Sequence, residues 1–131
     1  MSYLQNQDEH ALSQRLASLP SAVEVVVEGS IDHPIVVETL DVVSYLVSLS
    51  PETLSYEHHS GGLDPKVWLR SQVFRSLDIT FWGVPTGLEF TALVEAIELY
   101  SGIAPQLDVT TRSLLDQISS HIAASIFVSP T

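Results

Sequence analysis

The side chains that could carry out acid–base or metal chemistry in this chain are five histidines and 16 carboxylates. Asp32 and His33 are adjacent just before a predicted helix. A histidine titrates near neutral pH, so the two could form an acid–base pair. Capping of that helix is the simpler interpretation, and we favour it. The chain has no cysteine, which excludes a disulfide, a thiolate metal site and a cysteine nucleophile within it.

The adjacent residues His58 and His59 are the best candidates for a metal site, because acidic residues are close to them in sequence. Successive residues of a strand point to opposite faces, so both rings could bind one ion only if the chain turns between them. We favour a solvated loop and expect no metal. Glu89 could be a catalytic carboxylate, but its spacing from Thr86 already matches a helix capping box.

The charge balance limits the classes of partner. The chain has 16 acidic residues against 5 basic ones, a formal net charge of −11. Binding to nucleic acid or to an anionic membrane depends on Lys and Arg, so both are disfavoured. We interpret the charge as an acidic, soluble surface, with a basic protein partner as the alternative. The first residues lack the regions of a secretory signal, and no apolar run approaches the ~20 residues that span a bilayer, so we expect a cytoplasmic protein.

Sequence motifs for cofactors are also missing. The chain has no phosphate-binding loop, dinucleotide-binding fingerprint, metalloprotease helix or nucleophile elbow. The pair Gly61 and Gly62 is too isolated to hold a phosphate. We therefore expect no cofactor.

The first half of the chain predicts a βαβ unit. A β-branched run at residues 23–28 predicts a strand, and a short amphipathic helix carrying Leu12, Leu16 and Leu19 precedes it. The apolar spacing over residues 34–49 predicts a helix with Pro34 in its first turn. A second strand at residues 54–57 leads into a loop at residues 58–62.

The second half predicts an antiparallel hairpin and two helices. Residues 67–69 and 77–82 flank a polar stretch at residues 72–76. A helix with an apolar stripe follows the capping box at Thr86, and residues 101–105 end it. A last helix is predicted from about Asp108. Its apolar side chains on one side are Leu114, Leu115, Ile118 and Ile122.

This order of elements predicts a single α/β domain with a thioredoxin-like fold. Its core is a central mixed four-stranded sheet, built from the βαβ unit and the hairpin and flanked by helices on both faces. A chain of 131 residues fits one domain over residues 1–131. We expect residues 10–122 to form the core, with residues 1–8 and 127–131 frayed.

The segment at residues 83–90 couples a strand end, a proline-containing turn and a helix start. It resembles the corresponding stretch of the N-terminal tandem thioredoxin-fold module in the flavoprotein subunit of alkyl hydroperoxide reductase, and of the glutaredoxin-like protein disulfide oxidoreductases. The likeness extends over residues 10–122, including residues 54–57 and the last helix. The span from Glu57 to Pro65 is too short for the extra helix of a full thioredoxin, which matches the first, cysteine-free half of the tandem module.

The resemblance also implies positions for a site. In the active relatives two cysteines stand where the first strand meets its helix, because the helix N-terminus stabilises a thiolate. Those positions fall on Pro34 and Val37, which cannot form one. A cis-proline is expected opposite them, and Pro65 is the candidate. The candidate groove or partner contacts are Asp32, His33, Trp68, Gly83 and Pro85. For Trp68 and Trp82, core packing is the alternative, and we favour it.

The function implied by the resemblance is that of a non-catalytic thioredoxin-like module, binding a protein or acting as a scaffold in a thiol–disulfide redox or peroxide-detoxification system. The alternative is an accessory subunit or fragment of an alkyl hydroperoxide reductase-type system whose cysteines and flavin are on other chains. The expected partner is a thiol-redox protein or a peroxiredoxin system, and a homodimer is also compatible with the sequence. An enzyme that uses Asp32 and His33 is disfavoured, because helix capping accounts for both residues.

Overall fold

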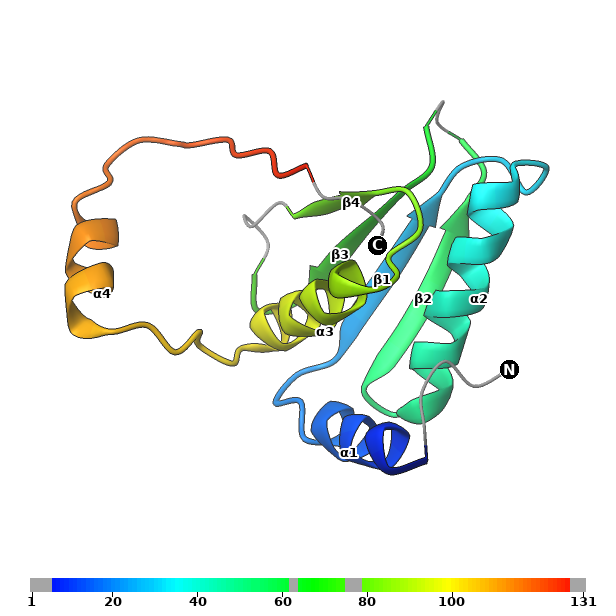
Figure 1. Ribbon diagram of the computed structural model, residues 1–131, viewed down its shortest axis with the longest axis horizontal. Helices are drawn as coiled ribbons and strands as arrows, with labels where there is room; N and C mark the ends of the chain where they lie inside the picture. Colours follow the sequence, from blue (N-terminus) through cyan, green and yellow to red (C-terminus); the bar gives the residue numbers. More distant parts are fainter. Residues whose placement is uncertain (1–5, 62–63, 75–78, 128–131) are drawn as a thin grey trace.

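The computed structural model describes residues 6–61, 64–74 and 79–127. Its described elements follow the order α1, β1, α2, β2, β3, β4, α3, α4. The four strands form one sheet in the order β2-β1-β3-β4, in which β1 pairs parallel with β2 and antiparallel with β3 (Figure 1). The predicted α/β class and mixed four-stranded sheet are confirmed. Among the described residues, no helix is both long enough and apolar enough to cross a bilayer.

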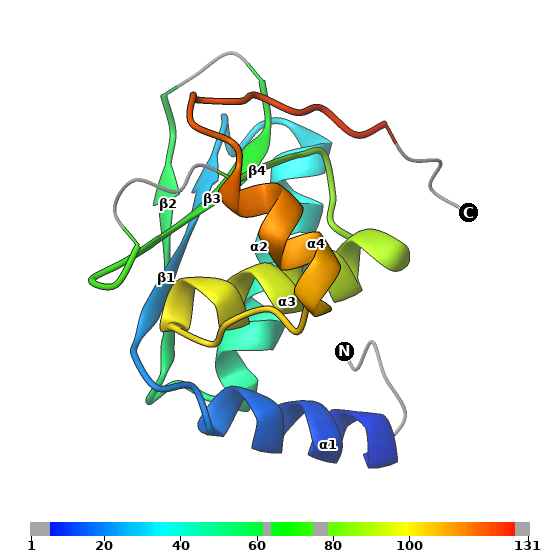
Figure 2. The same cartoon turned by 90° about the vertical axis from the view of Figure 1, so that its left-hand side faces the viewer.

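The helix α1 (Asn6–Ala17) begins earlier than expected. Asp8 and Glu9 lie in its first turn and Arg15 in its last, which suits the helix dipole, so residues 6–8 are helical rather than frayed. Its buried side chains are those of Leu12 and Leu16. The Leu16 carbonyl accepts a hydrogen bond of 2.8 Å from the Thr53 hydroxyl. This contact helps to hold α1 near the C-terminal end of α2 (Figure 2).

The predicted βαβ unit is present. The strand β1 (Val23–Glu28) and the helix α2 (Pro34–Leu49) have the predicted bounds. The strand β2 (Leu54–His59) is longer than predicted, because the parallel pairing with β1 continues to the Glu28–His59 pair. The expectation that His58 and His59 belong to a loop is therefore wrong.

The predicted hairpin strands are β3 (Lys66–Ser71) and β4 (Thr80–Trp82), which pair antiparallel. Residues 75–78, which include the predicted start of the second strand, lie outside the described residues. The helix α3 (Leu88–Ser101) follows. Its N-cap is Gly87, with φ +61°, and no side chain caps it. The predicted capping box is wrong, because the Glu89 amide donates to the backbone carbonyl of Thr86 instead.

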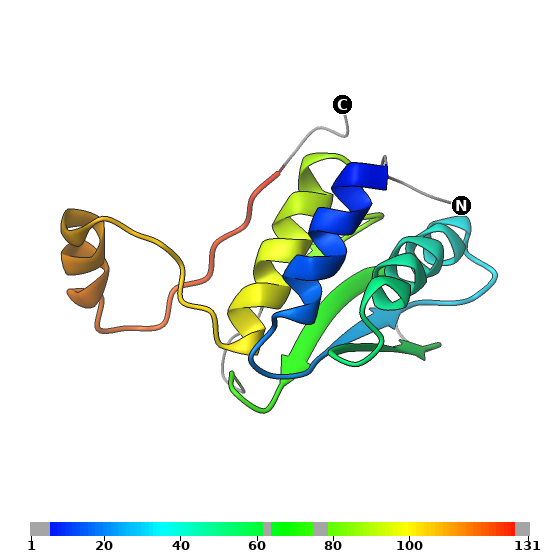
Figure 3. The same ribbon diagram turned by 90° about the horizontal axis from the view of Figure 1, so that it is seen from below.

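The three helices α1, α2 and α3 lie on one side of the sheet, as Figure 3 shows. Their buried side chains join those of Val23, Val25 and Val27 in a single core cluster. The expectation of helices on both faces is wrong for the described residues. We call the other side the open face: residues 24, 26 and 28 of β1, 55, 57 and 59 of β2, 66, 68 and 70 of β3, and 80 and 82 of β4. Most of these side chains are polar, and a sheet with antiparallel pairs can present such a face to water.

The last helix, α4 (Val109–Asp116), begins as predicted, with the Asp108 carboxylate accepting a hydrogen bond of 2.7 Å from the Thr111 amide. This bond lowers the pKa of Asp108. The prediction that Ile118 and Ile122 belong to this helix is wrong, because the helix ends at Asp116. Leu114 and Leu115 are exposed, and Ile118 and Ile122 lie beyond the helix and are exposed too. Residues 103–127 form an arm that leaves the body after α3 (Figures 1 and 3).

Candidate partner-binding site

The first turn of α2 begins at the carboxyl end of β1. His33 is its N-cap, and the ring atom Nδ1 accepts a hydrogen bond of 3.2 Å from the Ile35 amide. The interpretation of residues 32–33 as a helix cap is therefore confirmed for His33. Asp32 is exposed, and its amide donates to the Ser30 hydroxyl at 3.2 Å. Pro34 occupies a first-turn position, where a missing N–H costs nothing.

Pro34 and Val37 are exposed and lie three residues apart on one side of the first turn. Val37 exposes 44% of its surface, and the neighbouring Ile31 and Ile35 expose 54% and 37%. An apolar surface thus surrounds the free amide end of α2. We call residues 31–37 the α2 N-terminal end. It has no thiol, but it has apolar side chains that a polypeptide could contact.

Pro65 lies close to this end, as the resemblance implies. A Cβ atom placed on Gly29 would lie 2.5 Å from Cγ2 of Val36 and 3.4 Å from Cα of Pro65. Gly29, with φ +134°, has no side chain, so only its backbone lies between α2 and Pro65. The Gly83 amide donates to the Pro65 carbonyl at 3.4 Å, which brings the end of β4 to the same place.

The bond before Pro65 is trans, since no described peptide bond is cis. The candidate assignment of Pro65 as a cis-proline is therefore wrong. The trans form is the lower-energy isomer of an X–Pro bond, and here the chain enters β3 directly after Pro65 in an extended conformation.

Two other predicted contact residues lie elsewhere. Pro85 is buried in the turn before α3. Trp68 is on the open face, where its indole N–H donates to Glu28 at 3.0 Å. Trp68 is half-buried, while Trp82 exposes 61% of its surface. The preferred interpretation of both tryptophans as core residues is wrong, because the strand register directs their side chains away from the helices.

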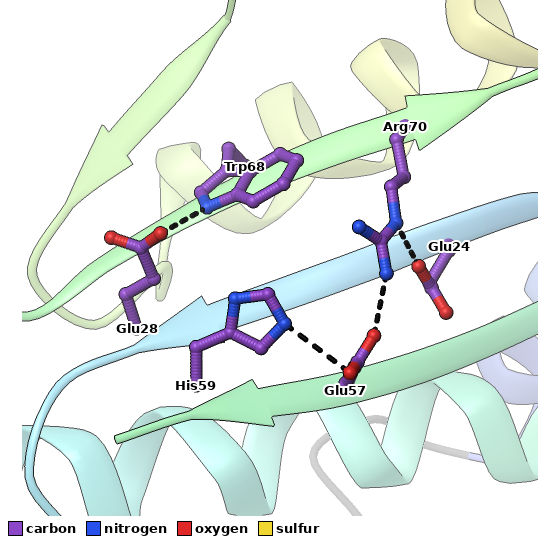
Figure 4. A network of polar contacts seen from close by, with 6 residues as sticks. All are labelled: Glu24, Glu28, Glu57, His59, Trp68 and Arg70. Carbon is purple, nitrogen blue, oxygen red and sulfur yellow. Dashed lines mark hydrogen bonds and ion pairs between the residues drawn. The ribbon is translucent and has the colours of Figure 1, made fainter. Parts of the chain in front are cut away.

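The open face carries a network of polar contacts that the sequence analysis missed (Figure 4). Arg70 of β3 reaches across β1 and pairs with both Glu24 and Glu57. The same Glu57 carboxylate lies 3.3 Å from Nε2 of His59, and the His59 ring meets the Trp68 ring edge-on at 6.2 Å between centroids. The signal was the alternation of charged residues along three neighbouring strands, which becomes visible only when their register is known.

The contacts of this network shift the pKa values of Glu28 and Arg70. Burial disfavours the ionised form of Glu28, but hydrogen bonds from Trp68 and Lys66 outweigh burial, so the pKa of Glu28 is lowered. The hydrogen bond to Glu24 and the charges of Glu24 and Glu57 raise the pKa of Arg70. Glu28 and Arg70 are therefore both charged at neutral pH.

The histidines do not gather into a metal site. His58 contacts the Gly29 carbonyl through Nε2 at 2.7 Å, whereas His59 points to the open face. Among the described residues, no group of three potential ligands is close enough to hold a metal ion. A wide hollow does lie between α3 and the arm, lined by residues that include Phe81, Ala92, Ala96 and Ile122. Its lining also includes Arg15 and three glutamates, of which Glu98 pairs with Arg15, and none of the residues of the α2 N-terminal end.

Comparison with known proteins finds similarity at the level of structure. No protein-family model matches the chain. No curated protein matches it by sequence. A domain of the alkylhydroperoxide reductase AhpF from Enterococcus faecalis V583 is similar, with a TM-score of 0.70, 18% identity, and coverage of 85% of this chain and 59% of that chain. A structure of a C503A mutant of AhpF from the same organism is also similar, with a TM-score of 0.70 and 17% identity. The match covers 86% of this chain and 59% of that chain.

A protein disulfide oxidoreductase from Aeropyrum pernix K1 is also similar, with a TM-score of 0.64 and 22% identity. The matched part covers 89% of this chain and 56% of that chain. The chain thus spans less than two thirds of each of these solved chains. The similarity of the backbones, together with the mixed sheet and its βαβ unit, establishes that the chain has a thioredoxin-like fold.

Proposed function

We propose that the chain is a non-catalytic thioredoxin-like module that binds a protein of a thiol–disulfide redox or peroxide-detoxification system through the α2 N-terminal end. The observation that carries the proposal is the arrangement of this end. The helix start and Pro65 lie together across Gly29, while Pro34 and Val37 occupy the positions that the resemblance gives to cysteines. Without a thiol, the surface can bind a polypeptide but cannot exchange a disulfide with it.

The exposed apolar side chains support binding rather than chemistry. Ile31, Ile35 and Val37 would each lose apolar surface to a partner. Burial of such surface stabilises a complex by about 25 cal/mol per Å² before the costs of association. The Nδ1 atom of His33 accepts the Ile35 amide in the helix cap, which gives this side chain a structural role.

A second candidate function is that of an accessory subunit or fragment in an alkyl hydroperoxide reductase-type system, with the cysteines and flavin on other chains. It is favoured by the similarity to the AhpF structures, of which this chain covers little more than half. The two candidates share the same binding surface. They differ in whether binding changes the rate of a reductase.

The test is a binding measurement with purified candidate partners, a thioredoxin and a peroxiredoxin, by isothermal titration calorimetry. The variant Val37→Glu introduces a charge into the α2 N-terminal end. Its matched control is Val73→Glu, because Val73 is exposed to 46%, close to the 44% of Val37, and follows the opposite end of β3. We expect Val37→Glu to weaken binding by at least about tenfold and Val73→Glu to leave it unchanged.

No binding to either partner, or equal losses in the two variants, would overturn the proposal. The second candidate is tested by adding the chain to a reconstituted flavoprotein–peroxiredoxin system and measuring the rate of peroxide reduction. A rate that changes with the wild-type chain, but not with Val37→Glu, supports the accessory role. An unchanged rate with a bound partner leaves the binding module as the function.

A further inference from the structure

The open face is a large surface of the sheet that no described helix covers. Both tryptophans of the chain lie on it, as does the only lysine. Trp82 is mostly exposed, whereas Val26, in the middle of the face, is fully buried beneath the surrounding side chains. The face is therefore an ordered layer of long side chains with an exposed aromatic ring at its rim.

The charge of this face differs from that of the whole chain. Its three carboxylates, on Glu24, Glu28 and Glu57, are opposed by two cations, on Lys66 and Arg70. The whole chain has a net charge of −11 and only five cationic residues. Two copies of such an acidic chain repel each other, and the repulsion is weakest where each surface carries both signs.

A symmetric contact between two copies uses the same patch on both, so each charge must find its complement within that patch on the partner. A face whose charges all had one sign would repel the same face of a second copy. On the open face, the cations of each copy can contact the carboxylates of the other. We infer that the open face is the contact surface of a homodimer in which two copies pack sheet against sheet.

The side chains of the face are already ordered for such a contact. Arg70 is fixed between two carboxylates and lies 5.6 Å from the centre of the Trp68 ring. Lys66 pairs with Glu28 at 3.3 Å and lies 5.4 Å from the centre of the Trp82 ring. Side chains that are ordered before association lose less conformational entropy on binding. Trp82 is the natural anchor, since exposed tryptophans are enriched among the residues that dominate interface energies.

Association of the full chain is measured by sedimentation velocity over about a hundredfold range of concentration. Tryptophan emission is recorded on the same samples. Because both tryptophans lie on the open face, dimerisation through it should shift the emission to shorter wavelength at the concentrations where the sedimentation coefficient rises. Trp82→Glu should weaken the dimer at least about tenfold.

Three further variants make the result specific. Ser55→Glu places a charge on an exposed position of the same face and should weaken the dimer without removing any contact of the network. Leu88→Glu, at a position that is 80% exposed at the start of α3, adds the same charge away from the sheet and should leave the dimer intact. Val37→Glu should also leave it intact, which separates this inference from the proposed function. A chain that stays monomeric at all concentrations would overturn the inference. So would a dimer that forms without an emission shift and is insensitive to Trp82→Glu.

Discussion

Gly29 follows β1 at a point where α2 and Pro65 both lie against the backbone. Its φ of +134° is one that side-chain-bearing residues rarely adopt, and a Cβ atom would lie 2.5 Å from Val36. Its amide and carbonyl are both engaged, by the His59 carbonyl at 2.9 Å and by the His58 ring at 2.7 Å. The backbone there cannot shift to relieve a clash without losing contacts to β2.

Gly29→Ala should therefore lower the free energy of unfolding by about 2–4 kcal/mol, from overpacking and from backbone strain together. Urea denaturation at equilibrium measures this loss. Gly61→Ala is the matched control, because a Cβ atom at position 61 would have no other atom within 4 Å and the φ there is not in the left-handed region. A Gly29→Ala chain as stable as the control would mean that α2 and Pro65 do not meet at Gly29.

Single residues show how much of the site could be predicted. The cap at His33 and the first-turn position of Pro34 follow from local chemistry, and the structure has both. The Thr86 cap had the same local signal, but Gly87 takes the N-cap position with a positive φ instead. The position of Trp68 depends on the register between β1 and β3, and register is a tertiary property that spacing along one strand does not contain.

At the scale of elements, α1 and α4 show the limit of apolar periodicity. Both segments carry apolar residues at helical spacing, Leu12 and Leu16 in the first and Leu114, Ile118 and Ile122 in the second, so the sequence predicts an apolar side for each. In α1 those leucines enter the core, whereas α4 has no buried residue. Periodicity predicts that a helix has an apolar side, but the surface that covers this side is supplied by other elements.

The contribution of α1 can be measured with Leu16→Ala. Leu16 is fully buried in the core cluster, so its truncation should lower the free energy of unfolding by about 3 kcal/mol through lost burial and a cavity. The urea midpoint should fall while the slope of the transition stays unchanged. The control is Leu88→Ala, at a leucine that is 80% exposed, where the expected loss is below about 0.5 kcal/mol. Equal effects at the two positions would place α1 outside the core.

At the scale of the whole molecule, the sequence predicted the order of the elements but not which face of the sheet the helices cover. The mixed sheet followed from the βαβ unit and the hairpin, and the structure has it. Helices on both faces were expected because a parallel pair is usually buried on both sides. Here the alternating charged residues of the open face, such as Glu24 and Arg70, pair with one another across strands and replace a covering helix.

The arm is the part of the molecule that contributes least to the folded body. Every described residue from 102 to 127 is exposed. The C-terminal end of α3 is completed by the first residue of the arm, because Gly102 adopts the left-handed conformation and the Ile103 amide donates to the Glu98 carbonyl at 3.1 Å. The last carbonyl groups of α3 therefore accept hydrogen bonds from the residues that directly follow the helix, as in other glycine-capped helices.

A chain that ends at Ala104 should therefore keep the stability of the body. We expect its free energy of unfolding to lie within about 0.5 kcal/mol of the full chain, since no buried residue is removed. Circular dichroism should lose only the signal of α4, and the hydrodynamic radius should fall by more than the loss of mass alone would cause, because the arm extends away from the body. A loss above about 1 kcal/mol, or a transition that is no longer cooperative, would show instead that the apolar residues of the arm pack on the body in solution. The hollow beside α3, lined by Phe81 and Ala96, would then be the surface that they cover.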